Sequence, residues 1–378
     1  MSGPRAFFWV QHLLGTGHLR RALLLAAALA DRGSRVLVAS GGPPARFPVH
    51  PDVEFVQLPP IRTADPDFAR LVTAQGEAVD AAHWAERRTR SLAALRAHDP
   101  DLLVIEHWPF GRSAFTAEVL ALVEAARARG AKVAGSVRDL LVSKADPNKY
   151  ERMLTWAAGL DRILVHGDPT LVPFAASFPL AERLGARLEH TGYLAPALVP
   201  VPLEARREIL VSAGGGAVGE RLCRAAIAAA RLLSDRPWRI VTGTGLPGAA
   251  FAALARDAPA HATVERQRED LALLIAAAAV SVSQAGYNTV VEALAGGTRM
   301  VLVPFASASE DEQTRRAEML AARGLARHLP ERELDGERLA DAVARALAAP
   351  PPPREAVRLD GLARSAELLS ELARADRS

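Results

Sequence analysis

Histidine 18 lies in a loop whose residue types and spacing could support proton transfer. The loop, Gly15-Thr16-Gly17-His18, separates an apolar run from a long helical pattern. The positive end of a helix disfavours an imidazolium, so we expect His18 to stay neutral and able to accept a proton. A lone histidine can also be a hydrogen-bonded residue near a helix cap. Its place in a glycine loop favours a general base that titrates in the ordinary histidine range.

Further polar pairs follow other apolar runs, namely Glu106 with His107, Arg138 with Asp139, and His166 with Asp168. Asp139 and Glu106 are therefore alternative candidates for a catalytic base. Each pair could instead cap the next helix, which is the favoured interpretation of Asp168 before Pro169. No two histidines fall at metal-ligand spacing and no nucleophile elbow is present, so we expect no metal site.

A glycine-rich stretch, "SAGGGAVGERL" at 212–222, also joins an apolar run to a helical pattern. Glycines let a backbone approach a ligand, and the following helix start attracts phosphate. Gly214, Gly216 and Gly219 satisfy the spacing of a dinucleotide-binding loop, but the next candidate strand, 238–243, ends without the acidic residue that binds a ribose. The stretch therefore gives little support for NAD and could be only a tight turn. No Gly-Lys-Ser/Thr is present, which excludes a P-loop.

The stretch "SQAGYNTVVEAL", residues 283–294, places glycine and asparagine where a buried strand should lead into a helix. The carboxylate of Glu292 follows on that helix. A polar turn in front of a helix start is a suitable place for a phosphate, and a carboxylate is a good partner for a diol.

The composition is that of a globular protein with two domains. The chain has 378 residues, 49% of them hydrophobic and 24% charged, with a formal net charge of +3. The positive residues are almost all scattered arginines, so we expect no nucleic-acid partner. Cys223 is the single cysteine, which excludes an internal disulfide.

Short β-rich runs alternate with helical patterns along the whole chain, which predicts parallel sheets with helices on both faces. The two halves open alike, with a strand, a glycine-bearing loop and a long helix. We therefore expect an α/β protein of two doubly wound Rossmann-like domains that face each other across a cleft, at 1–195 and 205–350. A proline-rich linker at 192–207 separates them, and a helix at 354–374 packs back towards the first domain. The candidate strands are 5–10, 35–40, 53–58, 101–106, 132–137 and 162–167, then 208–213, 238–243, 262–267, 279–284 and 299–304.

No segment predicts export or membrane insertion. The apolar run at the start is too short for a signal peptide, and polar residues interrupt the uncharged stretch 271–291. We expect a cytoplasmic protein. Peripheral contact with the inner membrane face stays open, because a lipid-linked acceptor requires only an exposed apolar patch.

The stretch from Ser283 to Ala317 resembles the C-terminal, nucleotide-sugar-binding domain of the family 28 glycosyltransferases, which have the GT-B fold. The matching pattern is Ser-x-x-Gly, Thr289, Glu292, a small-residue turn, Pro304-Phe305 and the pair Glu312-Gln313. In the first half the resemblance depends mainly on "GTGHLRRALLLAAALADRG", so Gly15 and Gly17 are assigned to an acceptor-side loop.

The resemblance implies a donor site in the second half. Gly286 and its neighbours would lie along the diphosphate, Glu292 would bind the ribose hydroxyls, and Glu312 and Gln313 would bind the sugar. The complete set of implied donor-binding residues is Gly214, Gly215, Gly216, Ser283, Gly286, Asn288, Thr289, Glu292, Glu312 and Gln313.

The function that we predict is metal-independent transfer of a hexosyl or N-acetylhexosaminyl group, without a cofactor, from a nucleoside-diphosphate sugar to an acceptor hydroxyl. The donor expected is a UDP-sugar, and the catalytic candidates are His18, Asp139 and Glu106. The sequence does not identify the acceptor. An epimerase of the same fold, a non-catalytic nucleotide-sugar sensor and a Rossmann oxidoreductase are the alternatives.

Overall fold

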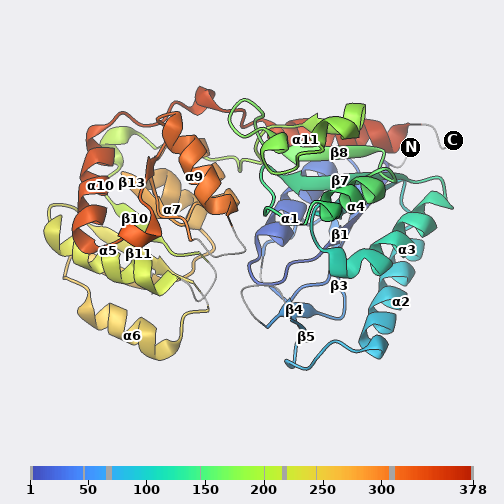
Figure 1. Ribbon diagram of the computed structural model, residues 1–378, viewed down its shortest axis with the longest axis horizontal. Helices are drawn as coiled ribbons and strands as arrows, with labels where there is room; N and C mark the ends of the chain where they lie inside the picture. The colour runs from blue at the N-terminus through green and yellow to red at the C-terminus, as the bar shows by residue number, and fades with distance from the viewer. Residues whose placement is uncertain are drawn as a thin grey trace. The chain divides into compact units, whose positions relative to one another are not determined.

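The computed structural model describes residues 3–45, 47–64, 70–144, 146–199, 201–214, 219–243, 245–305 and 311–375. The chain divides into two compact units (Figure 1). One comprises Met1–Leu194 together with Asp360–Ser378, and the other comprises Ala195–Leu359.

The first unit contains a seven-stranded parallel sheet in the order β3-β2-β1-β6-β7-β8-β9. The six strands predicted from the sequence are confirmed, and β9 adds a short edge strand. The bounds are β1 Arg5–Val10, β2 Arg35–Ser40, β3 Val53–Gln57, β6 Leu102–Glu106, β7 Lys132–Arg138, β8 Arg162–His166 and β9 Leu188–His190.

Helices cover both faces of this sheet because successive side chains of each strand point to opposite faces and are almost all apolar. Phe7 and Trp9 point into one core cluster with Phe115, whereas Phe8 points into another with Leu25 and Leu369. The last two lie on α1 and α11, which contact each other. Figure 1 shows α11, in red, among the blue and green elements of this unit. The helices are α1 Gly17–Ala30, α2 Ala81–His98, α3 Thr116–Arg127, α4 Asn148–Ala157 and α11 Gly361–Arg374.

The start of α11 is built around a glycine. A Cβ on Gly361 would lie 2.2 Å from the carbonyl oxygen of Gly192, so only glycine permits this approach. The amide of Gly361 donates to the carbonyl of Tyr193, and an isolated bridge joins Leu194 to Asp360. The final helix therefore begins at Gly361, several residues later than the sequence predicted.

The second unit contains a six-stranded parallel sheet in the order β12-β11-β10-β13-β14-β15. The five predicted strands are confirmed, and β15 was not predicted. The bounds are β10 Ile209–Ser212, β11 Trp238–Thr242, β12 Ala262–Arg266, β13 Val280–Ser283, β14 Arg299–Leu302 and β15 Arg327–His328. The helices are α5 Glu220–Leu232, α6 Gly248–Asp257, α7 Leu271–Ala277, α8 Tyr287–Gly296, α9 Glu312–Ala322 and α10 Gly336–Ala348.

Smaller elements complete the two units. An antiparallel hairpin of β4, Ile61–Thr63, and β5, Leu71–Thr73, extends from the first unit and was not predicted. Single-turn and short 3-10 helices are η1 Ser113–Phe115, η2 Phe174–Ala176, η3 Ala181–Arg187, η4 Leu203–Ala205, η6 Glu331–Glu333 and η7 Arg354–Ala356.

Both sheets reverse their strand order beside their first strand, at β1/β6 and at β10/β13. Open parallel sheets bind ligands beyond the carboxyl ends of the strands at such switch points. Ligand sites are therefore expected in the loops after β1, β6, β10 and β13.

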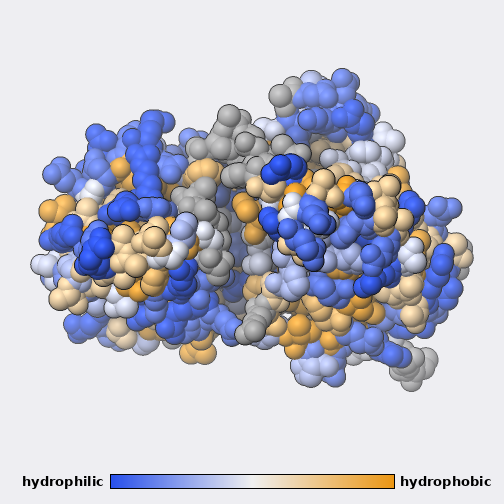
Figure 2. Space-filling view, turned by 90° about the horizontal axis from the view of Figure 1, so that it is seen from below, coloured by the Kyte–Doolittle hydropathy of each residue, from blue (hydrophilic) through white to orange (hydrophobic). Residues whose placement is uncertain are grey.

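Hydrophilic residues cover much of the face that Figure 2 shows, with hydrophobic residues in small groups between them. Among the residues that the structure describes, no helix combines the length and apolar character needed to cross a bilayer.

Candidate active site

His18 and Glu106 meet at the first switch point. His18 is the second residue of α1, which follows β1, and Glu106 is the last residue of β6. His18 Nδ1 lies 2.9 Å from Glu106 Oε1, although the two residues are 88 positions apart in the chain. His18 is 8% exposed and Glu106 is 1% exposed, so water competes little for this contact.

Glu106 accepts three polar contacts. Besides His18, Arg21 of the same helix donates to Oε1 in a close ion pair. The hydroxyl of Ser136, the residue directly opposite on β7, donates to Oε2 at 2.6 Å. Glu106 is thus buried and enclosed by donors, so its carboxylate does not meet solvent.

The proton of His18 can be placed from these contacts. Nδ1 also lies 2.8 Å from Arg21 Nη2, and it can either donate to Glu106 or accept from Arg21. A lone pair facing a carboxylate oxygen at 2.9 Å would be repelled, so we assign the proton to Nδ1. The other ring nitrogen, Nε2, then carries the lone pair.

Burial lowers the pKa of His18 well below its ordinary value of 6.5, and the neighbouring guanidinium groups of Arg112, Arg21 and Arg138 lower it further. The imidazole therefore stays neutral at physiological pH. The pKa of His107 is also well below 6.5, again chiefly through burial. Its ring centroid lies 4.6 Å from that of His18.

Asp139 and Asp168, two other candidates from the sequence, have structural contacts. Asp139 is fully buried, and its carboxylate accepts from the amide of Leu140 at 2.8 Å and from the hydroxyl of Tyr193 at 3.4 Å. Asp168 accepts from both the amide and the hydroxyl of Thr170. It closes a turn, whereas the sequence predicted a helix cap.

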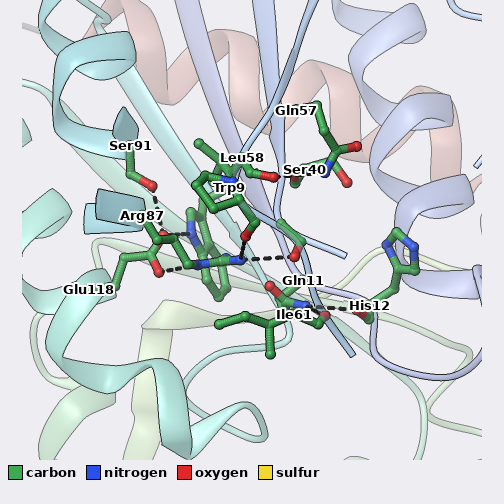
Figure 3. Close-up of polar contacts among 12 residues, drawn as sticks. Trp9, Gln11, His12, Ser40, Gln57, Leu58, Ile61, Arg87, Ser91 and Glu118 are labelled. Atoms are coloured by element: carbon green, nitrogen blue, oxygen red, sulfur yellow. Dashed lines mark hydrogen bonds and ion pairs between the residues drawn. The ribbon is translucent and has the colours of Figure 1, made fainter. Parts of the chain in front are cut away.

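The loop from β1 to α1 is held by its own polar side chains (Figure 3). Gln11 donates through its amide to the carbonyls of His12 and Ile61, at 2.7 and 2.9 Å. These bonds fix the chain that leads to Gly15, which is exposed, and to Gly17, the first residue of α1.

A second buried network lies in the same close-up. Glu118 on α3 accepts from the indole of Trp9, from the hydroxyl of Ser91 at 2.7 Å and from Arg87 at 2.5 Å. Arg87 also donates to the carbonyl of Gly41. This network fastens α2 and α3 to β1, which is a structural role.

The second switch point, at β10/β13, is lined by small residues, glycine and serine, at the strand ends and in the loops that follow them. Gly214 follows β10 with a φ of 67°, which favours glycine, and a Cβ there would lie 3.0 Å from the Gln284 side chain. Ser212 and Ser283 are register partners on β10 and β13. The two loops named by the sequence are therefore neighbours. Gly215 and Gly216 lie outside the described residues.

Gly286 is the residue before α8, with φ −62° and ψ 143°. Any residue can adopt these angles, and no atom of the described residues lies within 4 Å of a Cβ built at this position. Neither backbone strain nor packing against the described residues therefore requires glycine. The space in front of the helix start suits the close approach of a ligand.

The strained residue of this turn is its neighbour Ala285, with a φ of 60°. Arg316 on α9 donates to the Ala285 carbonyl at 3.0 Å, and its guanidinium lies 5.8 Å from the Tyr287 ring centroid. Sequence reasoning missed Arg316, although its spacing of four residues from Glu312 places both on one side of α9.

The remaining donor-site candidates lie on or beside the helices that follow β13 and β14. Glu292 on α8 is 2% exposed and Glu312, the first residue of α9, is 5% exposed. The side-chain oxygen of Gln313 accepts from the amide of Phe305 at 3.1 Å, so its amide group is oriented. Ser283 is buried at the end of β13, and Asn288 and Thr289 are half-buried in the first turn of α8.

Known proteins share this architecture. UGT2 of Phytolacca americana, complexed with UDP-2-fluoro-glucose and pterostilbene, has a TM-score of 0.62 at 14% identity, over 98% of this chain and 94% of that one. MurG of Acinetobacter baumannii has a TM-score of 0.56 at 17% identity, over 99% of this chain and 100% of that one. The chain therefore has the two-domain GT-B fold of these glycosyltransferases.

Sequence comparison identifies the glycosyltransferases that part of the chain resembles. Residues 215–367 match the model of the glycosyltransferase family 28 C-terminal domain, so this part of the chain is similar to that family. A segment of 130 residues is 38% identical to the "UDP-N-acetylglucosamine--N-acetylmuramyl-(pentapeptide) pyrophosphoryl-undecaprenol N-acetylglucosamine transferase" of Aromatoleum aromaticum. That segment covers 33% of this chain and little more than a third, 36%, of the relative.

Proposed function

We propose that the protein is a glycosyltransferase that moves a sugar from a nucleoside-diphosphate donor, in particular a UDP-sugar, to an acceptor hydroxyl. The observation that carries this proposal is the contact of 2.9 Å between His18 Nδ1 and Glu106. It supplies an oriented base in a chain that also contains a family 28 domain.

The turn before α8 is proposed to bind the diphosphate. Its backbone amides and the positive end of the helix attract negative charge, including the charge that grows on the leaving diphosphate. The open space that the described residues leave at Gly286 supports this assignment, because a ligand can approach the backbone there. Gly214 on the neighbouring loop completes the phosphate site.

Acidic and amide side chains would bind the rest of the donor. Glu292 accepts hydrogen bonds from the ribose hydroxyls, which a carboxylate can bind in pairs. Glu312 and Gln313 bind the sugar. The contact of Gln313 Oε1 with the Phe305 amide supports its role, since it leaves the amide hydrogens of Gln313 available to sugar oxygens.

In the reaction, His18 Nε2 accepts the proton of the acceptor hydroxyl. The acceptor oxygen forms a bond to the anomeric carbon, and the bond from that carbon to the diphosphate breaks. The diphosphate leaves with the electron pair. Glu106 accepts a hydrogen bond from Nδ1–H of His18. It therefore orients the imidazole and stabilises the imidazolium that forms.

A lipid-linked acceptor is proposed for this protein from one relative. The relative from Aromatoleum aromaticum is named for a pyrophosphoryl-undecaprenol substrate. Such an acceptor implies peripheral contact with the cytoplasmic face of a membrane.

The test is a binding screen followed by product analysis. Thermal shift and calorimetry over UDP, UDP-N-acetylglucosamine, other UDP-sugars and NAD should give the largest response to a UDP-sugar. Incubation of that donor with lipid-linked and soluble acceptors should then yield UDP and a glycosylated product.

The same screen distinguishes the alternatives. Conversion of the donor sugar without any acceptor would indicate an epimerase, and tight binding without turnover would indicate a sensor. A response to NAD that exceeds the response to UDP would contradict the proposal.

A further inference from the structure

A line of buried polar residues continues behind Glu106. Ser136 Oγ, which donates to Glu106, lies 2.9 Å from Nε2 of His166 on the adjacent strand β8. Nδ1 of His166 in turn lies 3.0 Å from the hydroxyl of Thr191 and 3.4 Å from the hydroxyl of Ser365 on α11. The four residues behind Glu106, namely Ser136, His166, Thr191 and Ser365, are each at most 1% exposed.

The direction of these hydrogen bonds follows from the carboxylate. An ionised Glu106 can only accept, so the single hydroxyl proton of Ser136 is directed to it. Ser136 must then accept from His166, which places a proton on His166 Nε2 and a lone pair on Nδ1. Thr191 or Ser365 donates to that lone pair. Burial lowers the pKa of His166 to about 3, so the ring is neutral, as this direction requires.

We propose that Ser136 and His166 are positioning residues that hold Glu106 so that the proton of His18 stays on Nδ1 and the Nε2 lone pair stays available. Ser365 of the C-terminal helix forms the far end of this chain. The catalytic consequence depends on the proposed function, whereas the control of the His18 tautomer does not.

Glu106 and Arg21 compete for His18 Nδ1, so a fixed Glu106 carboxylate is needed to keep the proton there. Arg21 Nη2 is 2.8 Å from Nδ1, so a Glu106 carboxylate that rotated away would leave Nδ1 to accept from Arg21. The proton would then move to Nε2, and His18 could no longer accept the acceptor proton. Ser136 prevents the rotation by fixing the second oxygen of Glu106. The charged and titratable groups that face His18 are Arg21, Glu106, Arg112, Arg138, His12 and His107.

The direct test is NMR of protein labelled with 15N-histidine, in which long-range correlations report the tautomer of each ring. His18 should show a proton on Nδ1 in the wild type. In Ser136→Ala we expect a substantial Nε2–H population at His18.

Ser91→Ala is the matched control. It also removes a buried serine that donates to a buried glutamate, at 2.7 Å, but that glutamate is Glu118 (Figure 3). It should cost similar stability and leave the His18 tautomer unchanged.

Kinetics give a second readout. Ser136→Ala should lower kcat about 10- to 100-fold, the range for loss of a hydrogen bond to a charged group, with donor affinity unchanged. His166→Phe should act in the same direction. His166→Gln should restore most of the rate and the wild-type tautomer, because its amide can donate to Ser136 as His166 Nε2 does. Ser365→Ala should have the smallest effect.

The outcomes separate this inference from the proposed function. An unchanged His18 tautomer in Ser136→Ala and His166→Phe, or an equal change in Ser91→Ala, would overturn it. If Ser136→Ala does not fold, the His18 tautomer in His166→Phe and His166→Gln tests the positioning role. If the wild type shows no transfer with any donor, the proposed function fails, while the NMR result still decides the positioning role.

Discussion

The two switch points of the molecule are topologically alike and chemically different. At β1/β6 the chain gathers His18, Arg21 and Glu106 within hydrogen-bonding distance of one another. At β10/β13 it places Gly214 beside the turn that contains Gly286. The first holds charges and titratable side chains in a buried network. The second brings glycines to a helix start, and the buried Arg316 donates to the backbone of its turn.

This difference indicates how one architecture can serve two tasks. Proton transfer requires a side chain with a controlled tautomer and pKa, so a base needs several partners around it. A diphosphate requires backbone amides and a helix start, so a donor site needs small residues that do not obstruct them. Variants of the two switch points should therefore affect different steps of the reaction.

The largest effect is expected at His18. His18→Ala should lower kcat by about 10²–10⁴-fold, the loss typical of a general base. Affinity for UDP should not change, because the proposed donor residues are in the other unit. Steady-state kinetics and calorimetry measure the two quantities.

His50→Ala is the control, since His50 forms a surface pair with Asp31 at 3.2 Å. Wild-type turnover in His18→Ala would show that the base is elsewhere, with Asp139 next to test.

Glu292 should give the next largest effect, on binding alone. Glu292→Ala should weaken UDP binding by about 1.5–3 kcal/mol, the usual contribution of hydrogen bonds to a charged group. Calorimetry with UDP measures this, and circular dichroism checks the fold. Equal UDP affinity in a folded variant would refute the ribose assignment.

Gly286 tests whether the second switch point is open for a ligand. Gly286→Ala should weaken UDP binding about tenfold, because a methyl group placed in a filled site typically costs 1–3 kcal/mol. The free protein should be unchanged or slightly more stable, since alanine accepts this backbone conformation. Gly248→Ala, at another glycine with open space, is the control. A loss of stability in Gly286→Ala without a loss of affinity would contradict the assignment.

The smallest effect concerns pH. The sequence alone predicts titration in the ordinary histidine range, whereas the structure lowers the pKa of His18 well below 6.5. The neutral imidazole is the active form, so kcat/KM should remain on its plateau as the pH falls through 6.5 and decline only near the lowered pKa. Arg112→Gln should move this decline to higher pH, since it removes a positive neighbour. An acid limb centred at the ordinary histidine value in the wild type would disagree with the site as described.

Local patterns were sufficient to predict most of the fold. Runs such as "RAFFWV" and "RILVHG" became β1 and β8 because continuous apolar segments must be buried on both faces of a parallel sheet. The hairpin β4–β5 and the edge strands β9 and β15 were not predicted. Each has only two or three residues, too few to establish a period.

The donor-site candidates could be named from the sequence because most lie in one continuous stretch with a family pattern. The strain at Ala285 could not be predicted, because it is the tertiary contact with Arg316 that holds this turn.

The sequence by itself determined two alternating α/β halves, a glycine loop before His18, and a segment that resembles the family 28 C-terminal domain. Only the tertiary structure decided which side chains meet. Glu106, Ser136 and His166 are spaced 30 residues apart and lie on three adjacent strands, and Ser365 is 199 residues from its partner His166. Sequence periodicity reports which residues are buried, but strand order and register decide which buried groups touch. Such contacts orient the His18 ring, the proposed base.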